Sequence, residues 1–150
     1  MDSGDNRAAL LAAVDGVYDT DHVVDVKLIQ DAAASIAVAT GPAPALVHCA
    51  AGKDRTGIVI GILLRATGVR HEDVLADYTR TRDRMPRLWA RLEQAGARLP
   101  DDPVLLSVAP HALTSVLDQV ESHPAGVAGW LTAAGAPPDL TDRLQGRLLG

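Results

Sequence analysis

Only one stretch of the sequence predicts a β-strand, and a loop and a strongly apolar segment follow it directly. Ala45–Cys49 is a short apolar run between Pro44 and a glycine-containing loop, which is typical of a buried central strand. Thr56–Thr67 is apolar on nearly every side, and Gly68 is placed to end it, so this segment predicts a buried helix. A strand, a loop and a helix in this order are a building block of α/β folds.

Most of the remaining sequence has the periodicity of helices. Helices are predicted at about residues 6–14, 23–39, 71–84, 86–95, 109–122, 125–134 and 139–149. Pro86 is expected to open a helix of its own, because proline is well tolerated in a first turn. We expect a single domain over residues 1–150, since a chain of this length can bury one core and no linker or internal repeat divides it. The core must consist mainly of aliphatic side chains, because the chain contains no phenylalanine.

Charge and cysteine content argue against several classes of protein. Lys and Arg number 14 and Asp and Glu number 19, so a sequence-independent nucleic-acid binder is not expected. The one cysteine cannot form an internal disulfide, and its spacing to the histidines matches no structural zinc site, so no metal or cofactor is implied. No apolar run is long enough for a membrane helix, and the acidic N-terminus does not resemble a signal peptide. We therefore expect a cytoplasmic location.

The loop from His48 to Gly57 carries the chemistry, because it joins the predicted strand to the N-terminus of the predicted helix. Unpaired N–H groups and the positive end of the helix dipole make such a junction a binding site for phosphate. Cys49 should face the centre of the loop, where these groups and Arg55 lower its thiol pKa and make it a nucleophile. Arg55, after five intervening residues, can hold two phosphoryl oxygens at once. Thr56 can offer its hydroxyl to the cysteine sulfur.

Four other residues of the loop have supporting roles in this interpretation. Gly52 permits a tight turn, and Gly57 lets the helix begin close to the strand. Lys53 adds a second cation, which suits substrates with more than one phosphate, such as phosphoinositides. His48 is expected to hold the cysteine in place through a backbone hydrogen bond, although a histidine satisfied in the core is an equally good interpretation.

This loop resembles the active-site loop of cysteine-dependent phosphatases. Ala51–Gly57, with the sequence AGKDRTG, is similar to that of the bacterial lipid-phosphatase-like tyrosine phosphatases, and the similarity continues through Gly68–Tyr78 and, more weakly, Trp130–Leu149. The resemblance implies a cysteine-phosphatase-like α/β fold, a parallel sheet with flanking helices, here rich in helix. Because that family carries the first strands of its sheet earlier in the chain, Met1 would stand in the middle of the domain. The chain is then expected to be the C-terminal portion of the family domain or a short form of it.

The resemblance also implies a two-step mechanism without a metal. Cys49 attacks phosphorus to form a phosphocysteine, which water then hydrolyses, while Arg55 stabilises the charge on the equatorial oxygens. Asp54 is the preferred general acid; Asp19 and Asp21 are the alternatives, because wider relatives carry the acid on a separate upstream loop. The implied substrates are phosphotyrosine proteins, together with phosphoserine or phosphothreonine proteins or phosphoinositides. The other groups implied to bind phosphate are the loop amides of Ala50, Ala51, Gly52, Lys53, Asp54 and Arg55, with Thr56 beside them.

Two other functions are compatible with the same loop. One is an inactive or truncated phosphate-binding module, and the other is a sulfur-transfer or arsenate-reducing enzyme, which also uses a cysteine in an anion-binding loop. Outside the loop, Arg80 and Arg84 share a helix face and could meet an acidic substrate, although a solvated face is the simpler interpretation. Asp77 is expected to pair with Arg80 or the loop. The aromatic residues expected to be core anchors are Tyr78, Trp89 and Trp130. No sequence feature indicates the oligomeric state.

Overall fold

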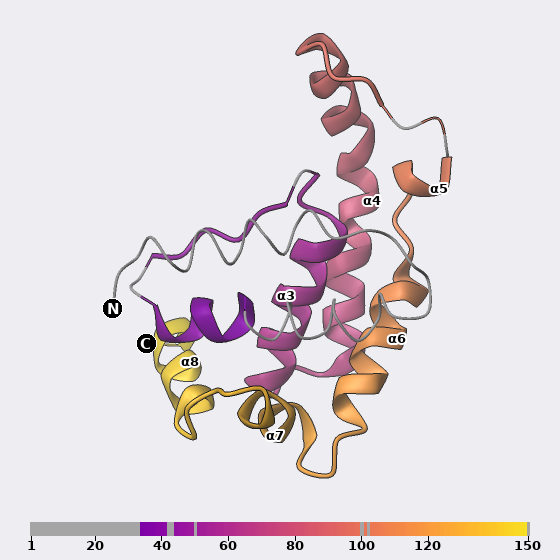
Figure 1. Cartoon of the computed structure of the whole chain (residues 1–150). Helices are drawn as coiled ribbons and strands as arrows, with labels where there is room; N and C mark the ends of the chain where they lie inside the picture. Colours follow the sequence, from indigo (N-terminus) through magenta and orange to yellow (C-terminus); the bar gives the residue numbers. More distant parts are fainter. Residues whose placement is uncertain (1–33, 42–43, 50, 100, 102, 150) are drawn as a thin grey trace.

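The computed structural model describes the chain except for residues 1–33, 42–43, 50, 100, 102 and 150. Residues 34–40 are helical, and they lie within the helix predicted at 23–39, whose first part falls outside the described residues. The predicted helix at 6–14 lies outside them as well. The helices that follow are α3 (Asp54–Ala66), α4 (His71–Gln94), α5 (Pro103–Leu106), α6 (Pro110–Glu121), α7 (Gly126–Ala133) and α8 (Leu140–Leu149) (Figure 1).

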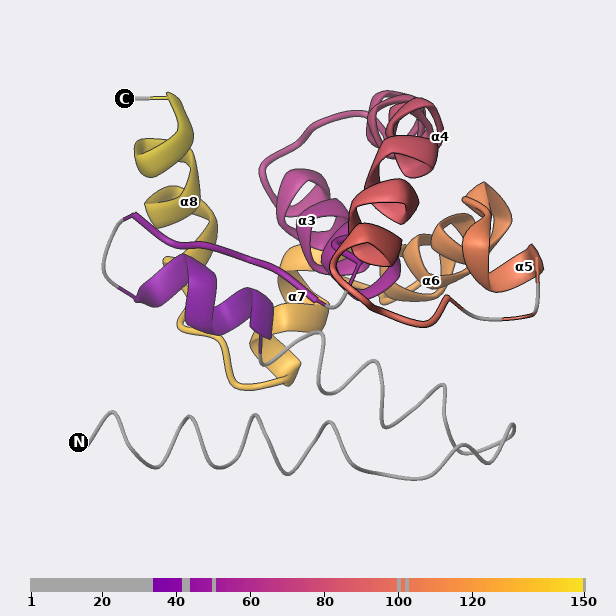
Figure 2. The same ribbon diagram turned by 90° about the horizontal axis from the view of Figure 1, so that it is seen from above.

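The helix α3 lies at the centre of this arrangement and packs against α4, α6 and α7 (Figures 1 and 2). Its Ile62 is fully buried, as are Leu113 and Leu117 of α6 and Leu131 of α7. Each such side chain contributes about 1.5–3 kcal/mol when it leaves water. Gly61 allows the close approach of α6, because a Cβ atom there would lie 3.3 Å from Leu113 Cδ1. The prediction of a buried helix at Thr56–Thr67 is confirmed.

The segment expected to be a buried central strand differs from the prediction. Residues 45–49 have no regular secondary structure, and the side chain of Leu46 is 87% exposed. No described segment forms a strand that could pair with residues 45–49, and without such a pair there is neither a ladder of hydrogen bonds nor a second layer to cover an apolar face. The predicted burial of this segment is therefore wrong, and the parallel sheet is not confirmed.

The prediction that Pro86 opens a helix is also wrong, because α4 runs without a break from His71 to Gln94. Proline removes one N–H from the helix, so the carbonyl of Arg82 loses its usual partner. Both residues are exposed, and water can replace that hydrogen bond. Packing on either side of the proline offsets the cost: Met85 is buried, and Trp89 Nε1 donates to the carbonyl oxygen of Leu106 at 3.1 Å.

Polar contacts join the helices at the end of α3 that is remote from the loop. Arg65 Nε donates to Glu121 Oε1 at 2.6 Å, and His71 Nδ1 lies 3.1 Å from the same oxygen. Burial alone would raise the pKa of Glu121, but the hydrogen bonds and charges of Arg65 and His71 lower it below the usual value. This cluster fixes the C-terminal end of α3 against α4 and α6. No described helix is long and apolar enough to cross a membrane.

Candidate active site

The loop before α3 turns sharply at a glycine. Gly52 has a φ of 65°, a backbone conformation that glycine adopts without steric cost. Helix α3 then begins at Asp54, and no hydrogen bond from the side chain of Lys53, its N-cap residue, covers its first turn. The N–H groups of that turn are therefore left for the thiol of Cys49 or for a bound anion.

Cys49 lies directly before this turn, and its side chain is half-buried. Burial raises the pKa of its thiol, but hydrogen bonds from the Thr56 hydroxyl and from the backbone N–H groups of Thr56, Lys53 and Gly52 outweigh it, so the pKa falls below its ordinary value. Thr56 Oγ1 is itself buried and has no hydrogen-bond partner of standard geometry among the described residues. The cysteine sulfur is thus the acceptor to which this hydroxyl can turn.

Replacing Thr56 by valine should raise the pKa of the Cys49 thiol. The change removes the hydroxyl that favours the thiolate and keeps the shape of the side chain, so less of the thiol is ionised at neutral pH. The rate of alkylation by iodoacetamide, measured between pH 5 and 9, should reach its midpoint at a higher pH than in the wild type. An unchanged midpoint would contradict a hydrogen bond from Thr56 to the sulfur.

Arg55 occupies the first turn of α3, one residue after Asp54. Its side chain is exposed, and it makes no ion pair or hydrogen bond with a described residue, whereas Arg65 of the same helix is bound to Glu121. No described residue therefore holds the guanidinium of Arg55.

Lys53 has a different environment from the one expected for a second phosphate-binding cation. Its side chain is only 4% exposed, its ammonium donates to the carbonyl oxygen of Ser107, and Nζ lies 3.2 Å from Asp54 Oδ2. Ser107 follows α5, whose last residue Leu106 is bound by Trp89 of α4. The lysine therefore ties the loop to the connection between α5 and α6.

Asp54 contacts two groups that sequence reasoning did not bring together. Its Oδ2 faces Lys53, and its Oδ1 accepts a long hydrogen bond of 3.4 Å from the Tyr78 hydroxyl. Burial, followed by the charge and the hydrogen bond of Asp54, raises the pKa of Tyr78 to about 12. Tyr78 is buried, as a core anchor should be, but its hydroxyl also reaches the loop. No local signal in the sequence predicts a contact between residues so far apart.

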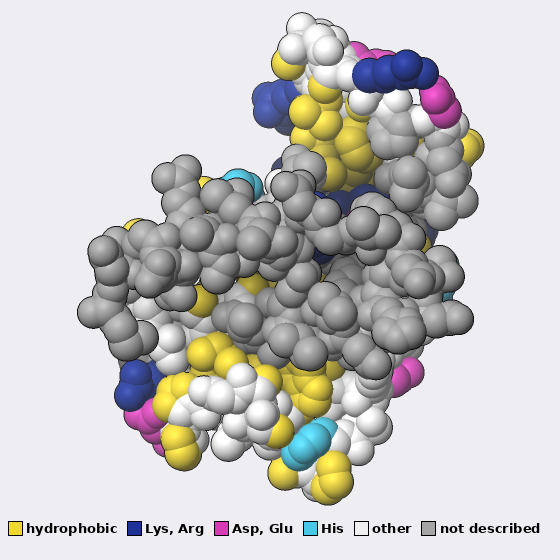
Figure 3. All heavy atoms as spheres, viewed as in Figure 1, with side chains coloured by type: hydrophobic (Ala, Val, Ile, Leu, Met, Phe, Trp, Pro, Cys, Tyr) yellow, Lys and Arg dark blue, Asp and Glu magenta, His cyan; other side chains and the backbone are white. Residues whose placement is uncertain are grey.

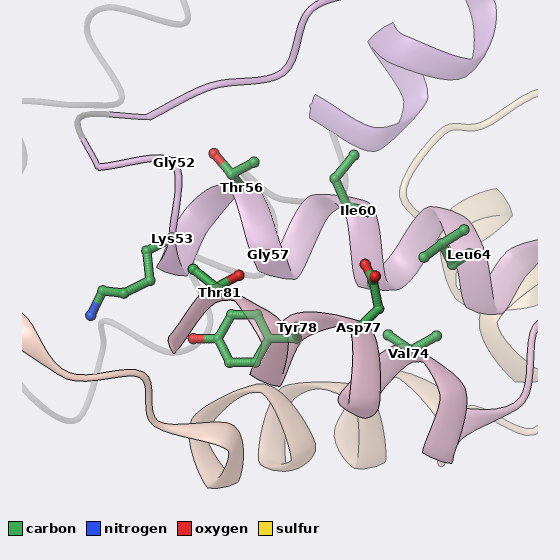
Figure 4. A pocket seen from close by; sticks show the side chains of 11 residues that line it. Gly52, Lys53, Thr56, Gly57, Ile60, Leu64, Val74, Asp77, Tyr78 and Thr81 are labelled. Carbon is green, nitrogen blue, oxygen red and sulfur yellow. The ribbon is translucent and has the colours of Figure 1, made fainter. Parts of the chain in front are cut away.

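A groove of about 150 Å³ lies beside the loop, between α3 and α4 (Figure 4). Gly52, Lys53, Thr56 and Gly57 line the end near the loop, and the other end combines apolar side chains with the carboxylate of Asp77. In Figure 4 the side chain of Lys53 extends away from Ile60 and Leu64, and the Tyr78 hydroxyl points toward the same end of the groove as Lys53. The lining residues are Gly52, Lys53, Thr56, Gly57, Ile60, Gly61, Leu64, Val74, Asp77, Tyr78 and Thr81.

Gly57 is required by the position of Tyr78. A Cβ atom on Gly57 would lie 2.6 Å from Tyr78 Cε2 and 2.8 Å from Cδ2, distances that no side chain tolerates without movement. Gly57→Ala should therefore lower the free energy of unfolding by about 1–3 kcal/mol, measured by urea denaturation. Gly146→Ala is the matched control, because nothing lies within 4 Å of a Cβ atom there. Equal stability of the two variants would contradict the close packing of Tyr78 on α3.

The remaining predicted residues are dispersed around the loop. His48 is exposed, so it is not a core histidine. Asp77 pairs with Arg80, with 3.8 Å between Oδ1 and Nη1, which confirms one of the two expected pairings. The candidate residues that lie outside the described residues are Asp19, Asp21 and Ala50.

Comparison with known proteins places this site in a family context. Residues 4–150 match the model of a family described as the tyrosine phosphatase family. The chain is 32% identical over 124 residues to the triple specificity protein phosphatase PtpB of Mycobacterium tuberculosis, an alignment that covers 71% of this chain and 44% of the relative. It is 39% identical over 80 residues to a Cupriavidus necator protein named for tyrosine-protein phosphatase activity, covering 53% of this chain and 27% of that protein. The chain thus spans less than half of the length of either relative.

Proposed function

Because the chain belongs to the tyrosine phosphatase family, we propose that it hydrolyses phosphomonoesters, with Cys49 as the nucleophile and phosphotyrosine proteins as the first class of substrate. The proposal rests on one observation: the Cys49 thiol lies at the turn before α3, where the Thr56 hydroxyl and the N–H groups of Gly52, Lys53 and Thr56 lower its pKa. A lowered pKa favours the thiolate, which is the nucleophilic form of cysteine. Arg55, on the same helical turn, supplies the charge that a transferred phosphoryl group needs.

The first step transfers the phosphoryl group from the substrate oxygen to sulfur. The Cys49 thiolate attacks phosphorus, the bond between phosphorus and the substrate oxygen breaks, and that oxygen takes a proton from Asp54. Arg55 and the loop amides balance the charge on the equatorial oxygens during the transfer. The products of this step are the free alcohol or phenol and a phosphocysteine.

Water completes the reaction in the second step. The ionised Asp54 accepts a proton from a water molecule while the water oxygen attacks phosphorus. The bond between phosphorus and sulfur breaks, and the Cys49 thiolate leaves. The Thr56 hydroxyl can stabilise the departing sulfur, because that hydroxyl already favours the thiolate. The enzyme returns to its starting form and inorganic phosphate is released.

Asp54 is proposed as the acid on the basis of its place in the site. It begins α3, and its side chain is 56% exposed, so a substrate oxygen can reach it. Its two contacts, Lys53 and Tyr78, hold the carboxyl in one orientation. Asp19 and Asp21 remain the alternative acids, and the leaving-group dependence of Asp54→Asn separates them, since loss of the acid slows poor leaving groups most.

The same proposal covers the fold and the compartment. We propose a fold of the cysteine-phosphatase type with a parallel sheet. Residues 45–49 have no regular secondary structure in the described part of the chain, and they would need a neighbouring strand to be stable as a strand. A reducing compartment such as the cytoplasm suits a mechanism that depends on a single free thiol.

Steady-state hydrolysis of p-nitrophenyl phosphate in the presence of EDTA tests the proposal directly. Turnover that needs no added metal and is inhibited by vanadate is the expected result. A series of phosphotyrosine, phosphoserine and phosphothreonine peptides and a phosphoinositide then establishes the substrate range. Absence of turnover in a folded chain would contradict the proposal.

A phosphate-binding module without turnover is the second candidate. It is favoured by the exposed segment before Cys49, which leaves the nucleophile without a buried strand behind it. Calorimetric binding of phosphate, combined with the absence of a phosphocysteine after rapid acid quench with a ³²P-labelled substrate, is the outcome that this candidate predicts.

A further inference from the structure

The part of α4 from Arg80 onward carries a concentration of positive charge. Arg80, Arg84, Arg87 and Arg91 follow one another at spacings of four, three and four residues, and all are exposed. At 3.6 residues per turn, these side chains start within a sector of roughly 60° around the helix. We call these four residues the arginine stripe. The chain as a whole has a net charge of −5, so this surface has the opposite sign to the molecule that carries it.

The arginine stripe is not neutralised by its own helix. Among the described residues, Arg80 is the one member of the stripe that forms an ion pair, with Asp77 at 3.8 Å. The acidic residues of α4 beyond Arg80, Asp83 and Glu93, make no ion pair with the stripe. Three pairs of arginines, Arg80–Arg84, Arg84–Arg87 and Arg87–Arg91, are neighbours at three or four residues, and like charges at these spacings destabilise a helix by about 0.2–0.5 kcal/mol per pair. Asp83 stands at the same spacings from Arg80 and Arg87 without forming an ion pair with either. On a solvated helix face whose charges stabilise the helix, positively and negatively charged side chains would alternate.

The stripe begins at the edge of the candidate active site. Asp77, the partner of Arg80, lines the groove together with Tyr78 and Thr81, and the Tyr78 hydroxyl reaches Asp54. From there α4 projects past the N-terminal end of α3 (Figure 1). The space-filling view shows Lys and Arg side chains on this projecting part of the molecule (Figure 3). A substrate with its phosphate at the loop could therefore continue along the arginine stripe.

We infer that the arginine stripe binds an acidic segment next to the phosphorylated residue of a protein substrate, an inference that rests on the proposed function. From Arg80 to Arg91 the helix rises by about 16 Å, which matches about five residues of extended peptide. A narrow line of guanidinium groups suits one extended chain whose carboxylates lie along it, since each guanidinium can bind a carboxylate with two hydrogen bonds.

A membrane surface fits the stripe less well than a peptide does. Stable binding to a bilayer combines positive charge with apolar side chains that insert. In the described part of the chain, the highly exposed large hydrophobic residues are Leu46 and Leu148, and neither belongs to α4. The acidic net charge of the chain also opposes adsorption to an anionic plane, whereas a single peptide contacts only the stripe.

Kinetics on two matched phosphotyrosine peptides test this inference. One peptide carries four glutamates beside the phosphotyrosine and the other carries four glutamines, and p-nitrophenyl phosphate reports on the site without flanking residues. The triple variant Arg84→Gln, Arg87→Gln, Arg91→Gln should raise KM for the acidic peptide by about tenfold at low salt and leave kcat unchanged. It should not change the kinetics of the glutamine peptide or of p-nitrophenyl phosphate. High salt should abolish the difference.

Arg82→Gln is the control, to be compared with Arg87→Gln, because each removes one exposed charge of α4 and Arg82 begins roughly 160° away from Arg80. The control should leave KM for the acidic peptide unchanged. Equal losses in the two single variants, or equal losses on both peptides, would overturn the inference. So would binding of phosphatidylserine vesicles that depends on the stripe while acidic peptide does not bind.

A binding measurement separates this inference from the proposed function. Fluorescence anisotropy with a labelled, unphosphorylated peptide containing four glutamates needs no catalysis. If p-nitrophenyl phosphate is not hydrolysed but this peptide binds the wild type and not the triple variant, the proposed function fails and the docking surface stands. If hydrolysis occurs and the peptide binds both proteins equally, the inference fails alone.

Discussion

Replacing Cys49 with serine should reduce the turnover of p-nitrophenyl phosphate by at least about 10⁴-fold, as expected when an enzyme loses its nucleophile. The serine hydroxyl has nearly the same shape, but its pKa is far higher, so the contacts that lower the pKa of the thiol cannot produce a comparable amount of the anion. The loss should appear in kcat. Steady-state kinetics at neutral pH, with acid-quench detection of the phosphoenzyme, provides the measurement.

The serine variant should keep its fold and its anion site. Cys49 is only half-buried, and the amide N–H groups of Gly52, Lys53 and Thr56 that surround the sulfur belong to the backbone. Thermal unfolding and phosphate binding by calorimetry should therefore match the wild type. Activity that survives the substitution in a correctly folded variant would refute the assignment of Cys49 as nucleophile.

Arg55→Lys should reduce kcat/KM by about 10²–10³-fold, a loss similar to that of one stabilising group in a charged transition state. Lysine keeps the positive charge, but its ammonium cannot hold two phosphoryl oxygens in one plane as a guanidinium does. Because Arg55 is exposed and makes no ion pair with a described residue, the unfolding temperature should not change. Kinetics with p-nitrophenyl phosphate and the inhibition constant of vanadate both report the effect.

The control for this change is Arg143→Lys on α8. Arg143 is also exposed and pairs with Asp139 at 2.7 Å, so the substitution alters an arginine of similar accessibility far along the chain. It should leave kcat/KM unchanged. A near-normal rate for Arg55→Lys would show that the charge alone is sufficient and would contradict the bidentate role.

Helices α3, α6, α7 and α8 could be predicted because the sequence pattern of each lies within one segment. The apolar residues of α3 and the periodicity of α6, α7 and α8 are contained within single segments, and the structure confirms them. The strand at residues 45–49 could not be judged this way, since a strand is stabilised by its neighbour and not by its own side chains. The prediction at Pro86 failed for a similar reason. Contacts of Met85 and Trp89 on either side of the proline outweigh the tendency of proline to interrupt a helix.

The candidate site shows the same division between neighbours in the chain and distant residues. The proximity of Cys49, Thr56 and the turn at Gly52 follows from their spacing around a helix start, and the lowered pKa of the thiol agrees with it. The position of the Lys53 ammonium does not follow from its spacing, because Ser107, its acceptor, lies 54 residues further along the chain. The contact of Tyr78 with Asp54 spans 24 residues and needed the packing of α4 on α3.

The sequence by itself determined which residues surround the nucleophile, because a turn followed by a helix brings residues a few positions apart to one place whatever the rest of the chain does. The tertiary structure alone decided the environment of Lys53, the second role of Tyr78, and the continuity of α4 that places the arginine stripe on one helix. These depend on how buried aliphatic surfaces of separate helices fit together, and no single segment carries that information.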